Sequence, residues 1–253
     1  MRQEERFSLI LERLSEKGSV GVNDLSGDLG VSLASIRRDL QILENQRLLT
    51  RTHGGAVALN MVYELPLRYR GGRHKEEKRR IALEAAERVG AGINSVGLTG
   101  GTTTTEVARA LMERSGLTIV TNALNIASEL ALRPNLKLLV TGGWARSESY
   151  ELVGPLAEAS LQGLNLDLAI VGVDGISAQG GITTHDVVEA RTNRAMLDRA
   201  GRVVVVADGS KVGRMAFACI APVTVLGELI TDASANPGEL ERLREAGMVI
   251  TII

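Results

Sequence analysis

Segment 32–43, SLASIRRDLQIL, places apolar and polar residues with the period of a helix. Its apolar positions recur at i, i+4 and i+7 and predict one buried stripe. The stripe comprises Ile36, Leu40 and Leu43, and the positions outside it include Ser35, Arg37 and Arg38. Ser32 can cap this helix by accepting a hydrogen bond from a first-turn amide. The pattern therefore predicts a helix with one face for a core and one polar, basic face.

Two further helices are predicted before this one. Segment 2–17 repeats apolar residues at helical spacing, and Gly18 follows it at a position typical of a helix C-cap. A short second helix is expected to begin at Asn23, to carry Leu25 and Leu29, and to end at Gly30. Two helices joined by a glycine turn over about 20–39 are typical of a helix-turn-helix.

A hairpin is predicted after the third helix. The run RLLTRTHGGAVAL contains two strand-like stretches separated by His53 and two glycines. Three helices and a hairpin predict a winged helix over residues 1–59, with Arg51 and His53 presented to the DNA backbone or minor groove. In helix 32–43, Ser32 and Ser35 are small enough to approach base edges, and its arginines can reach guanine or phosphate. The alternative is an ordinary helix with a solvated basic face.

The rest of the chain has a different pattern. Between residues 61 and 72 the periodicity is lost and Pro66 interrupts the chain, so we expect a linker over 60–74. From 75 to 253 short apolar strands alternate with helices, as in SVGLT followed by 103–114 and LTIVT followed by 123–132. This order predicts an α/β domain with a doubly wound, mostly parallel, Rossmann-like sheet, in which ligands bind at the carboxyl ends of the strands.

Glycines and polar residues gather where these strands end. Residues 100–105, GGTTTT, close the first strand and open a helix, so amides, hydroxyls and a positive helix end converge on a spot suited to phosphate. Asn122, Asp174 and Lys211 follow other strands, and together such groups suit a phosphorylated polyol. Each has a simpler reading as turn or capping chemistry, and Glu189 as an exposed helix residue. Their recurrence at strand ends favours a binding site.

Composition and charge narrow the picture. No apolar run is long enough to cross a membrane and no signal peptide is evident, so we expect a cytoplasmic protein without a membrane partner. Cys219 is the only cysteine and the three histidines match no zinc motif, so neither metal nor cofactor is predicted. The net charge of −1 is unevenly divided along the chain: residues 1–60 carry no net charge, residues 68–80 carry +5, and the remaining residues carry −6. Positive charge therefore lies near the first domain and the linker.

The motifs resemble those of one family. VSLASIRRDL followed by LLTRTHGGA is similar to the N-terminal domain of the DeoR family of bacterial sugar-metabolism regulators. GGTTTTEVA, IVTNALNIA, GVDGI, GGITT, EARTNRAM and ADGSKVGR resemble its effector domain, which is itself similar to ribose-phosphate isomerase. Many members have an aspartate where this chain has Thr99. The resemblance implies two sets of ligand contacts: Gly101, Thr102, Thr103 and Thr104 on phosphate, and Asn122, Asp174, Thr183, Glu189 and Lys211 around the sugar.

Three functions are compatible with these features. The first is a transcription regulator, a repressor of a carbohydrate-metabolism operon, that binds double-stranded operator DNA as a homo-oligomer and responds to a phosphorylated sugar. The second is a sugar-phosphate isomerase in which Asp174, Glu189 and Lys211 act as acid, base and electrostatic stabiliser. The third is a nucleotide-binding module, which no Walker A or G-x-G-x-x-G motif supports. The winged helix favours the regulator, since an isomerase needs no recognition helix.

Overall fold

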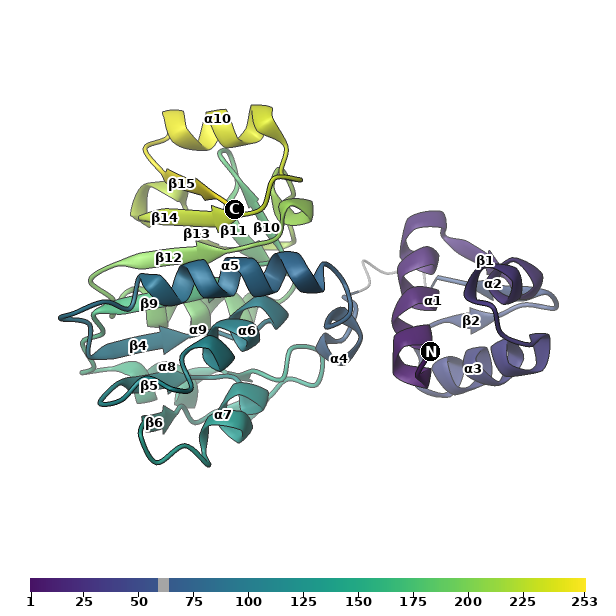
Figure 1. Ribbon diagram of the computed structural model, residues 1–253, viewed down its shortest axis with the longest axis horizontal. Coiled ribbons are helices and arrows are strands. Elements are labelled where there is room, and N and C mark those ends of the chain that lie inside the picture. The colour runs from purple at the N-terminus through teal and green to yellow at the C-terminus, as the bar shows by residue number, and fades with distance from the viewer. Residues whose placement is uncertain (59–63) are drawn as a thin grey trace. The chain divides into compact units, whose positions relative to one another are not determined.

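The chain folds into two units, Met1–Arg73 and His74–Ile253. The computed structural model describes residues 1–58 and 64–253 (Figure 1). The first unit contains α1 (Gln3–Lys17), α2 (Val22–Leu29) and α3 (Leu33–Asn45). Their apolar stripes converge on one core, which confirms that each helix buries one face. Gly18 ends α1 with a φ of 71°, as its position predicted.

One predicted helix start is wrong. The N-cap of α2 is Gly21, and Asn23 lies inside the helix. The reason is a strand that the pattern did not reveal: β1 (Ser19–Gly21) runs directly into α2. It pairs antiparallel with β3 (Gly55–Val57), which also pairs with β2 (Thr50–Arg51) to form the wing. Gly55 must be glycine there, because a Cβ atom would lie 1.8 Å from the Val20 carbonyl oxygen.

The segment expected as a linker is partly folded. Residues 59–63 lie outside the described residues, but 64–73 belong to the first unit and include α4 (Leu67–Arg70). Tyr69 is buried and packs edge-on against Phe7, with ring centroids 6.1 Å apart. Its hydroxyl donates a hydrogen bond to Gln46 Oε1 at 2.6 Å. The interruption by Pro66 suggested a linker, yet two apolar residues beyond it bury enough surface to hold the segment against α1.

The second unit is built on a seven-stranded sheet in the order β15-β14-β12-β9-β4-β5-β6. Every adjacent pair is parallel, which confirms the predicted sheet. The strands are β4 (Ser95–Leu98), β5 (Thr118–Thr121), β6 (Lys137–Val140), β9 (Leu168–Gly172), β12 (Val203–Val206), β14 (Glu228–Thr231) and β15 (Val249–Ile252). The strand order reverses between β4 and β9, the point where ligands bind in such sheets.

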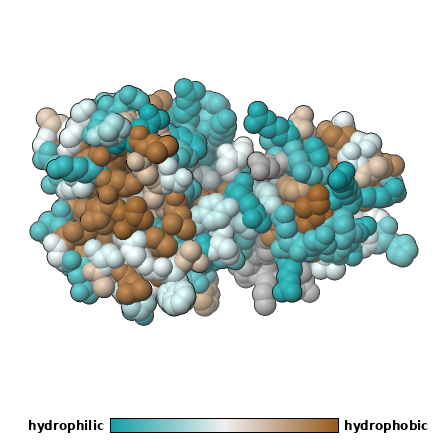
Figure 2. All heavy atoms as spheres, turned by 90° about the horizontal axis from the view of Figure 1, so that it is seen from below, coloured by the Kyte–Doolittle hydropathy of each residue, from teal (hydrophilic) through white to brown (hydrophobic). Residues whose placement is uncertain are grey.

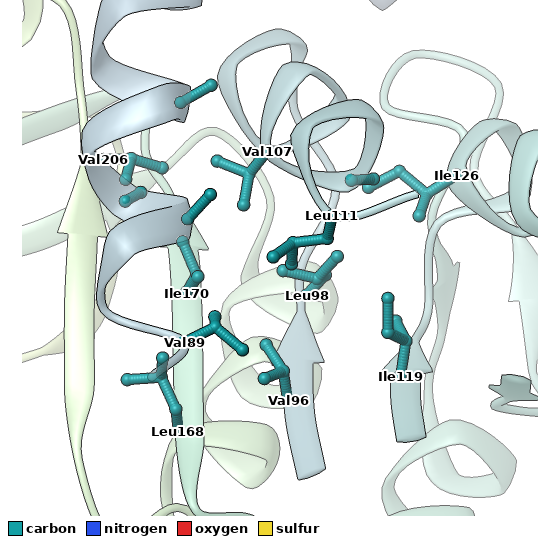
Figure 3. Close-up of a cluster of buried hydrophobic side chains, with 14 of the residues drawn as sticks. Val89, Val96, Leu98, Val107, Leu111, Ile119, Ile126, Leu168, Ile170 and Val206 are labelled. Carbon is teal, nitrogen blue, oxygen red and sulfur yellow. The ribbon is translucent and has the colours of Figure 1, made fainter. Parts of the chain in front are cut away.

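Helices cover both faces of this sheet. Along β12, Val204 and Val206 pack with α5 (Lys75–Glu87), α6 (Thr102–Ala110) and α7 (Leu124–Leu130) (Figure 3). Val203 and Val205 face the opposite core, formed with α9 (Val187–Leu197) and α10 (Pro237–Glu245). A third cluster adds α8 (Pro155–Leu161) on this second face. Burial on both faces explains the nearly continuous apolar runs of the strands.

Two smaller sheets accompany the large one. An antiparallel sheet with the order β10-β11-β13 contributes to the second core; its strands are β10 (Gly175–Ser177), β11 (Gly181–Thr184) and β13 (Ala218–Ala221). A hairpin joins β7 (Trp144–Ala145) and β8 (Leu152–Val153). Short 3-10 helices, η1 (Gly209–Lys211) and η2 (Val223–Val225), complete the unit. None of the helices in the described part of the chain is long and apolar enough to cross a membrane.

One edge of the large sheet is apolar. Strand β6 is the last strand of the sheet, with Leu138 and Leu139 half-buried and Val140 exposed. Leu132 and Leu156 are exposed as well. Figure 2, which views the protein from the side of β6, shows apolar side chains gathered over the second unit.

Candidate functional site

Helix α3 has the features of a recognition helix. The Ser32 side chain accepts a hydrogen bond from the Ser35 amide at 3.2 Å, which confirms the predicted N-cap. Arg37 and Arg38 are exposed, and within the described residues neither forms an ion pair. Two guanidinium groups on one exposed face suit a polyanion.

A buried ion pair holds α3 against α1. Asp39 is almost fully buried and accepts hydrogen bonds from Arg6 Nε at 2.7 Å and Nη2 at 3.0 Å. Gln3 donates a third bond at 3.2 Å. The carboxylate beside it raises the pKa of the Arg6 guanidinium, so Arg6 stays charged. Asp39 lies next to the exposed arginines in sequence, and its contacts with α1 fix the position of the helix that carries them.

The wing carries Arg51 and His53, the two residues predicted to contact the DNA backbone or minor groove. Arg51 lies on β2, where its Nη1 donates a hydrogen bond to Gln41 and its backbone amide donates one to Glu44 Oε1 at 2.9 Å. Both partners belong to α3, so Arg51 ties the wing to the recognition helix. His53 is exposed at the turn between β2 and β3.

The loop after β4 opens α6. Gly101 has a φ of 131°, which only glycine adopts readily, and the amide of Thr105 is the first to bond back to the Gly101 carbonyl. The hydroxyls of Thr104 and Thr105 also donate to that carbonyl, at 3.0 and 2.6 Å. No hydrogen bond from the hydroxyl of Thr102 or Thr103 is found among residues 1–58 and 64–253. These two threonines thus retain hydroxyls at a helix N-terminus.

Several polar side chains lie around Asp174, which follows the end of β9. Lys211 Nζ lies 3.8 Å from its Oδ1, and His185 Nε2 lies 4.0 Å from its Oδ2. The Thr184 hydroxyl donates to Oδ2 at 3.1 Å. Lys211 closes η1, whose N-cap Asp208 accepts a hydrogen bond from the Ser210 amide. The Asp-Gly-Ser-Lys turn predicted at a strand end therefore carries its lysine to the Asp174 carboxylate.

Glu189 belongs to the same cluster, which excludes its alternative reading as an exposed helix residue. It is buried, and its carboxylate accepts hydrogen bonds from the Thr184 hydroxyl and, at 3.1 Å, from Arg146 Nη1. Arg146 Nε lies 3.8 Å from Asp186, the residue that caps α9. Arg146 is contributed by the turn between β7 and β8. No strand-end motif marks that turn, so the sequence pattern alone gives no sign of this arginine.

Glu151 is a deeply buried acid in this region that no sequence motif indicated. Its Oε1 accepts a hydrogen bond of 2.5 Å from the Gly100 amide. Asn193 donates weakly to both carboxylate oxygens, at 3.4 Å, and accepts a bond of 3.1 Å from Asn122. Burial raises the pKa of Glu151 well above its usual range, and the charge of nearby Glu189 raises it further. Asn122 Oδ1 is buried and has no hydrogen-bond partner among the described residues.

Thr183 occupies a different environment from its neighbour Thr184. The Thr183 hydroxyl donates to the Gly175 carbonyl at 3.2 Å and accepts a bond from the Ala216 amide at 2.8 Å. Its bonds thus join backbone segments, whereas the Thr184 hydroxyl faces the carboxylates. Thr99 is also turned inward, where it accepts a bond of 3.1 Å from the Gly172 amide across the switch point.

Two family models together match nearly the whole chain. The DeoR-like helix-turn-helix domain matches residues 6–62, and the DeoR C terminal sensor domain matches residues 73–233.

The chain belongs to the DeoR family.

Relatives agree with this assignment over their full length. The HTH-type transcriptional regulator GlpR of Haloferax volcanii is 37% identical over 97% of this chain and 96% of its own. The glycerol-3-phosphate regulon repressor of Escherichia coli K12 is 34% identical over 92% of each chain. Ribose 5-phosphate isomerase A of Methanocaldococcus jannaschii is similar over 55% of this chain and 54% of its own, with 19% identity and a TM-score of 0.41. This DeoR-family protein is a DNA-binding transcriptional regulator, as its helix-turn-helix domain and the names of these relatives show.

Proposed function

We propose that this DeoR-family protein represses a carbohydrate-metabolism operon in the cytoplasm and that a phosphorylated sugar controls its binding to operator DNA. The observation that carries the proposal is the strand-end cluster of the sensor unit. It places the Asp174 carboxylate, Lys211 and the buried Glu189 beyond the strands of a doubly wound sheet. Such groups are the usual partners of sugar hydroxyls.

The phosphate is assigned to the first turn of α6. Thr102 and Thr103 lie in this turn, their hydroxyls donate no hydrogen bond within the described residues, and the helix dipole favours an anion beside the free amides. Thr104 supports the loop through its bond to Gly101. Asn122 lies at the end of the neighbouring strand β5, with a free acceptor for a sugar hydroxyl.

Operator DNA is assigned to the exposed face of α3. Arg37 and Arg38 reach bases or phosphates, while Ser32 and Ser35 lie at the N-terminal end of the helix, the part that enters the major groove. His53 at the tip of the wing contacts the backbone. Arg51 acts through α3, because its guanidinium is bonded to Gln41.

A second copy of the chain is assigned to the β6 edge. The amides of Lys137 and Thr141 bond inward to β5, so the backbone groups of Leu138 and Val140 face outward. An antiparallel copy centred on Leu139 would pair Leu138 with Val140 of the second copy and place no like charges opposite each other. Covering this apolar edge would also remove an aggregation risk. A dimer presents two recognition helices to two half-sites.

The experiment begins with selection of preferred sequences from a random DNA library by the full chain. Binding of the selected duplex is then measured by fluorescence anisotropy at fixed salt, with and without a panel of sugar phosphates. We expect at least one sugar phosphate to change DNA affinity and the DNA to change affinity for that ligand by the same factor. If no sequence is enriched, or if no sugar phosphate binds the protein, the proposal is wrong.

A further inference from the structure

Glu151 lies beside the proposed effector site and differs from its other acids. Within the described residues, the carboxylates of Asp174 and Glu189 each have a cationic partner, Lys211 and Arg146 respectively. Glu151 has none within ion-pair distance there. Its contacts are the Gly100 amide, the Asn193 amide and the neighbouring Glu189. A buried carboxyl without a counter-charge is costly, so such a group needs a reason to be present.

The groups around Glu151 offer more acceptors than donors. Asn122 follows Asn193 in the chain of hydrogen bonds that starts at Glu151, and its Oδ1 is buried and unpartnered. Asn193 bonds Glu151 only weakly, at 3.4 Å. An unsatisfied buried acceptor, joined through Asn193 to a carboxyl that has no cationic partner, favours a ligand that donates several hydrogen bonds.

We infer that Glu151 selects a phosphorylated amino sugar as the effector by accepting hydrogen bonds from the ammonium group of that sugar. This inference rests on the proposed function. An ammonium carries three donors for these acceptors, and its positive charge is a counter-charge for Glu151 once that carboxyl ionises. A hydroxyl carries one donor and no charge. The Gly100 amide that donates to Glu151 directly precedes the turn of α6 to which the phosphate is assigned. The same loop therefore lies beside both proposed subsites, one for the ammonium group and one for the phosphate.

Ligand binding is then linked to a proton. Without a ligand, burial and the adjacent Glu189 hold the pKa of Glu151 high and favour its protonated form. The groups that face it are Glu189 and Asn193 from α9, Asn122 from the end of β5, and the Gly100 amide. An arriving ammonium stabilises the carboxylate, and the Glu151 proton leaves to solvent. Binding of an amino sugar phosphate should therefore release about one proton, and binding of its hydroxyl counterpart none.

The test compares matched ligand pairs on the full chain by calorimetry. The pairs are glucosamine 6-phosphate with glucose 6-phosphate, galactosamine 6-phosphate with galactose 6-phosphate, and serinol phosphate with glycerol phosphate. We expect the amino member of a pair to bind about tenfold or more tightly than the hydroxyl member, as a charged hydrogen bond implies. Glu151→Gln should remove that preference. Glu158→Gln, which alters a half-buried glutamate on α8 paired with Arg191, should retain it.

The outcomes separate this inference from the proposed function. If hydroxyl members bind as tightly as amino members, or if Glu151→Gln keeps the preference, the inference is wrong while sugar-phosphate sensing stands. If no member of any pair binds, the proposed function itself fails. The number of protons released by the unaltered chain is obtained from the binding enthalpies measured in buffers of different ionisation enthalpy. A count near zero for a binding amino ligand would overturn the role of Glu151 even if the variant failed to fold.

Discussion

The ion pair between Asp39 and Arg6 should control the stability of the DNA-binding unit. Replacing Asp39 with alanine removes the acceptor of three hydrogen bonds, two of them from one guanidinium. The side chain of Asp39 is 1% exposed and that of Arg6 is 15% exposed. The variant therefore leaves a largely buried cation without its partner, at the contact between α1 and the recognition helix.

The expected loss is about 3 kcal/mol of unfolding free energy, at the low end for a broken buried pair because Arg6 retains some access to water. Asp28→Ala is the matched control in the same unit. It also removes an aspartate 2.7 Å from an arginine, Arg13, but this side chain is 52% exposed. An exposed pair contributes about 0.2–1 kcal/mol, so the control should lose little.

Urea unfolding of the full chain measures the two units separately. Trp144 is the only tryptophan and lies in the sensor unit, so its fluorescence reports that unit alone. Far-UV circular dichroism also reports the helices of the first unit. In Asp39→Ala we expect part of the dichroism signal to be lost at lower urea while the Trp144 transition stays in place. Equal effects of Asp39→Ala and Asp28→Ala would refute the assignment of the buried pair as the element that holds α3.

Other predictions follow from the two sites, the sheet edge and one carboxylate. Arg37→Ala should weaken DNA binding without unfolding the domain, by about 1–3 kcal/mol if it contacts a base; unchanged affinity at fixed salt would exclude a DNA contact. Thr103→Glu should abolish the ligand response and preserve operator binding, because its carboxylate repels phosphate; retained ligand affinity in calorimetry would contradict the phosphate assignment. Val140→Lys should shift the assembly toward monomer in light scattering, and an unchanged mass would disprove the β6 interface. Backbone and hydroxyl bonds lower the pKa of Asp167, so its stabilising effect should be present at neutral pH and be lost as pH falls through that lowered pKa. Asp167→Asn should thus be less stable than the parent at pH 7, with the difference vanishing in acid; a pH-independent difference in urea midpoints would refute this.

Local patterns were sufficient to predict most of the helices and strands and to name candidate site residues. The stripe of α3 and its cap at Ser32 depend on residues within three or four positions of each other, so the sequence alone determined them. The alternation of apolar strands and helices likewise determined the parallel sheet, since buried strands need apolar residues on both faces. The same pattern predicted where the strands end, which is why Asp174, Lys211 and Thr102 could be named as candidate ligand-binding residues.

Contacts between distant segments decided the rest. Strand β1 has three residues and exists because β3 pairs with it, so no local pattern announces it. The bond from the Arg51 guanidinium to Gln41 arises from the packing of the wing against α3, which no local pattern predicts. Residues 64–73 belong to the first unit because Tyr69 reaches Phe7 across more than sixty positions.

The same distinction holds inside the sensor site. Adjacent threonines on β11 point to opposite sides, and only pairing with the neighbouring strands decides that Thr184 rather than Thr183 meets the carboxylates. Glu151 directly precedes β8 and belongs to no motif, and the hairpin of β7 and β8 carries it to Gly100, fifty-one positions away in sequence. Burial raises the pKa of that carboxyl only in the folded state. The sequence determined which residue types stand at strand ends. The tertiary structure alone decided which of them share a site, because side-chain proximity and desolvation arise from packing between segments that are remote in the chain.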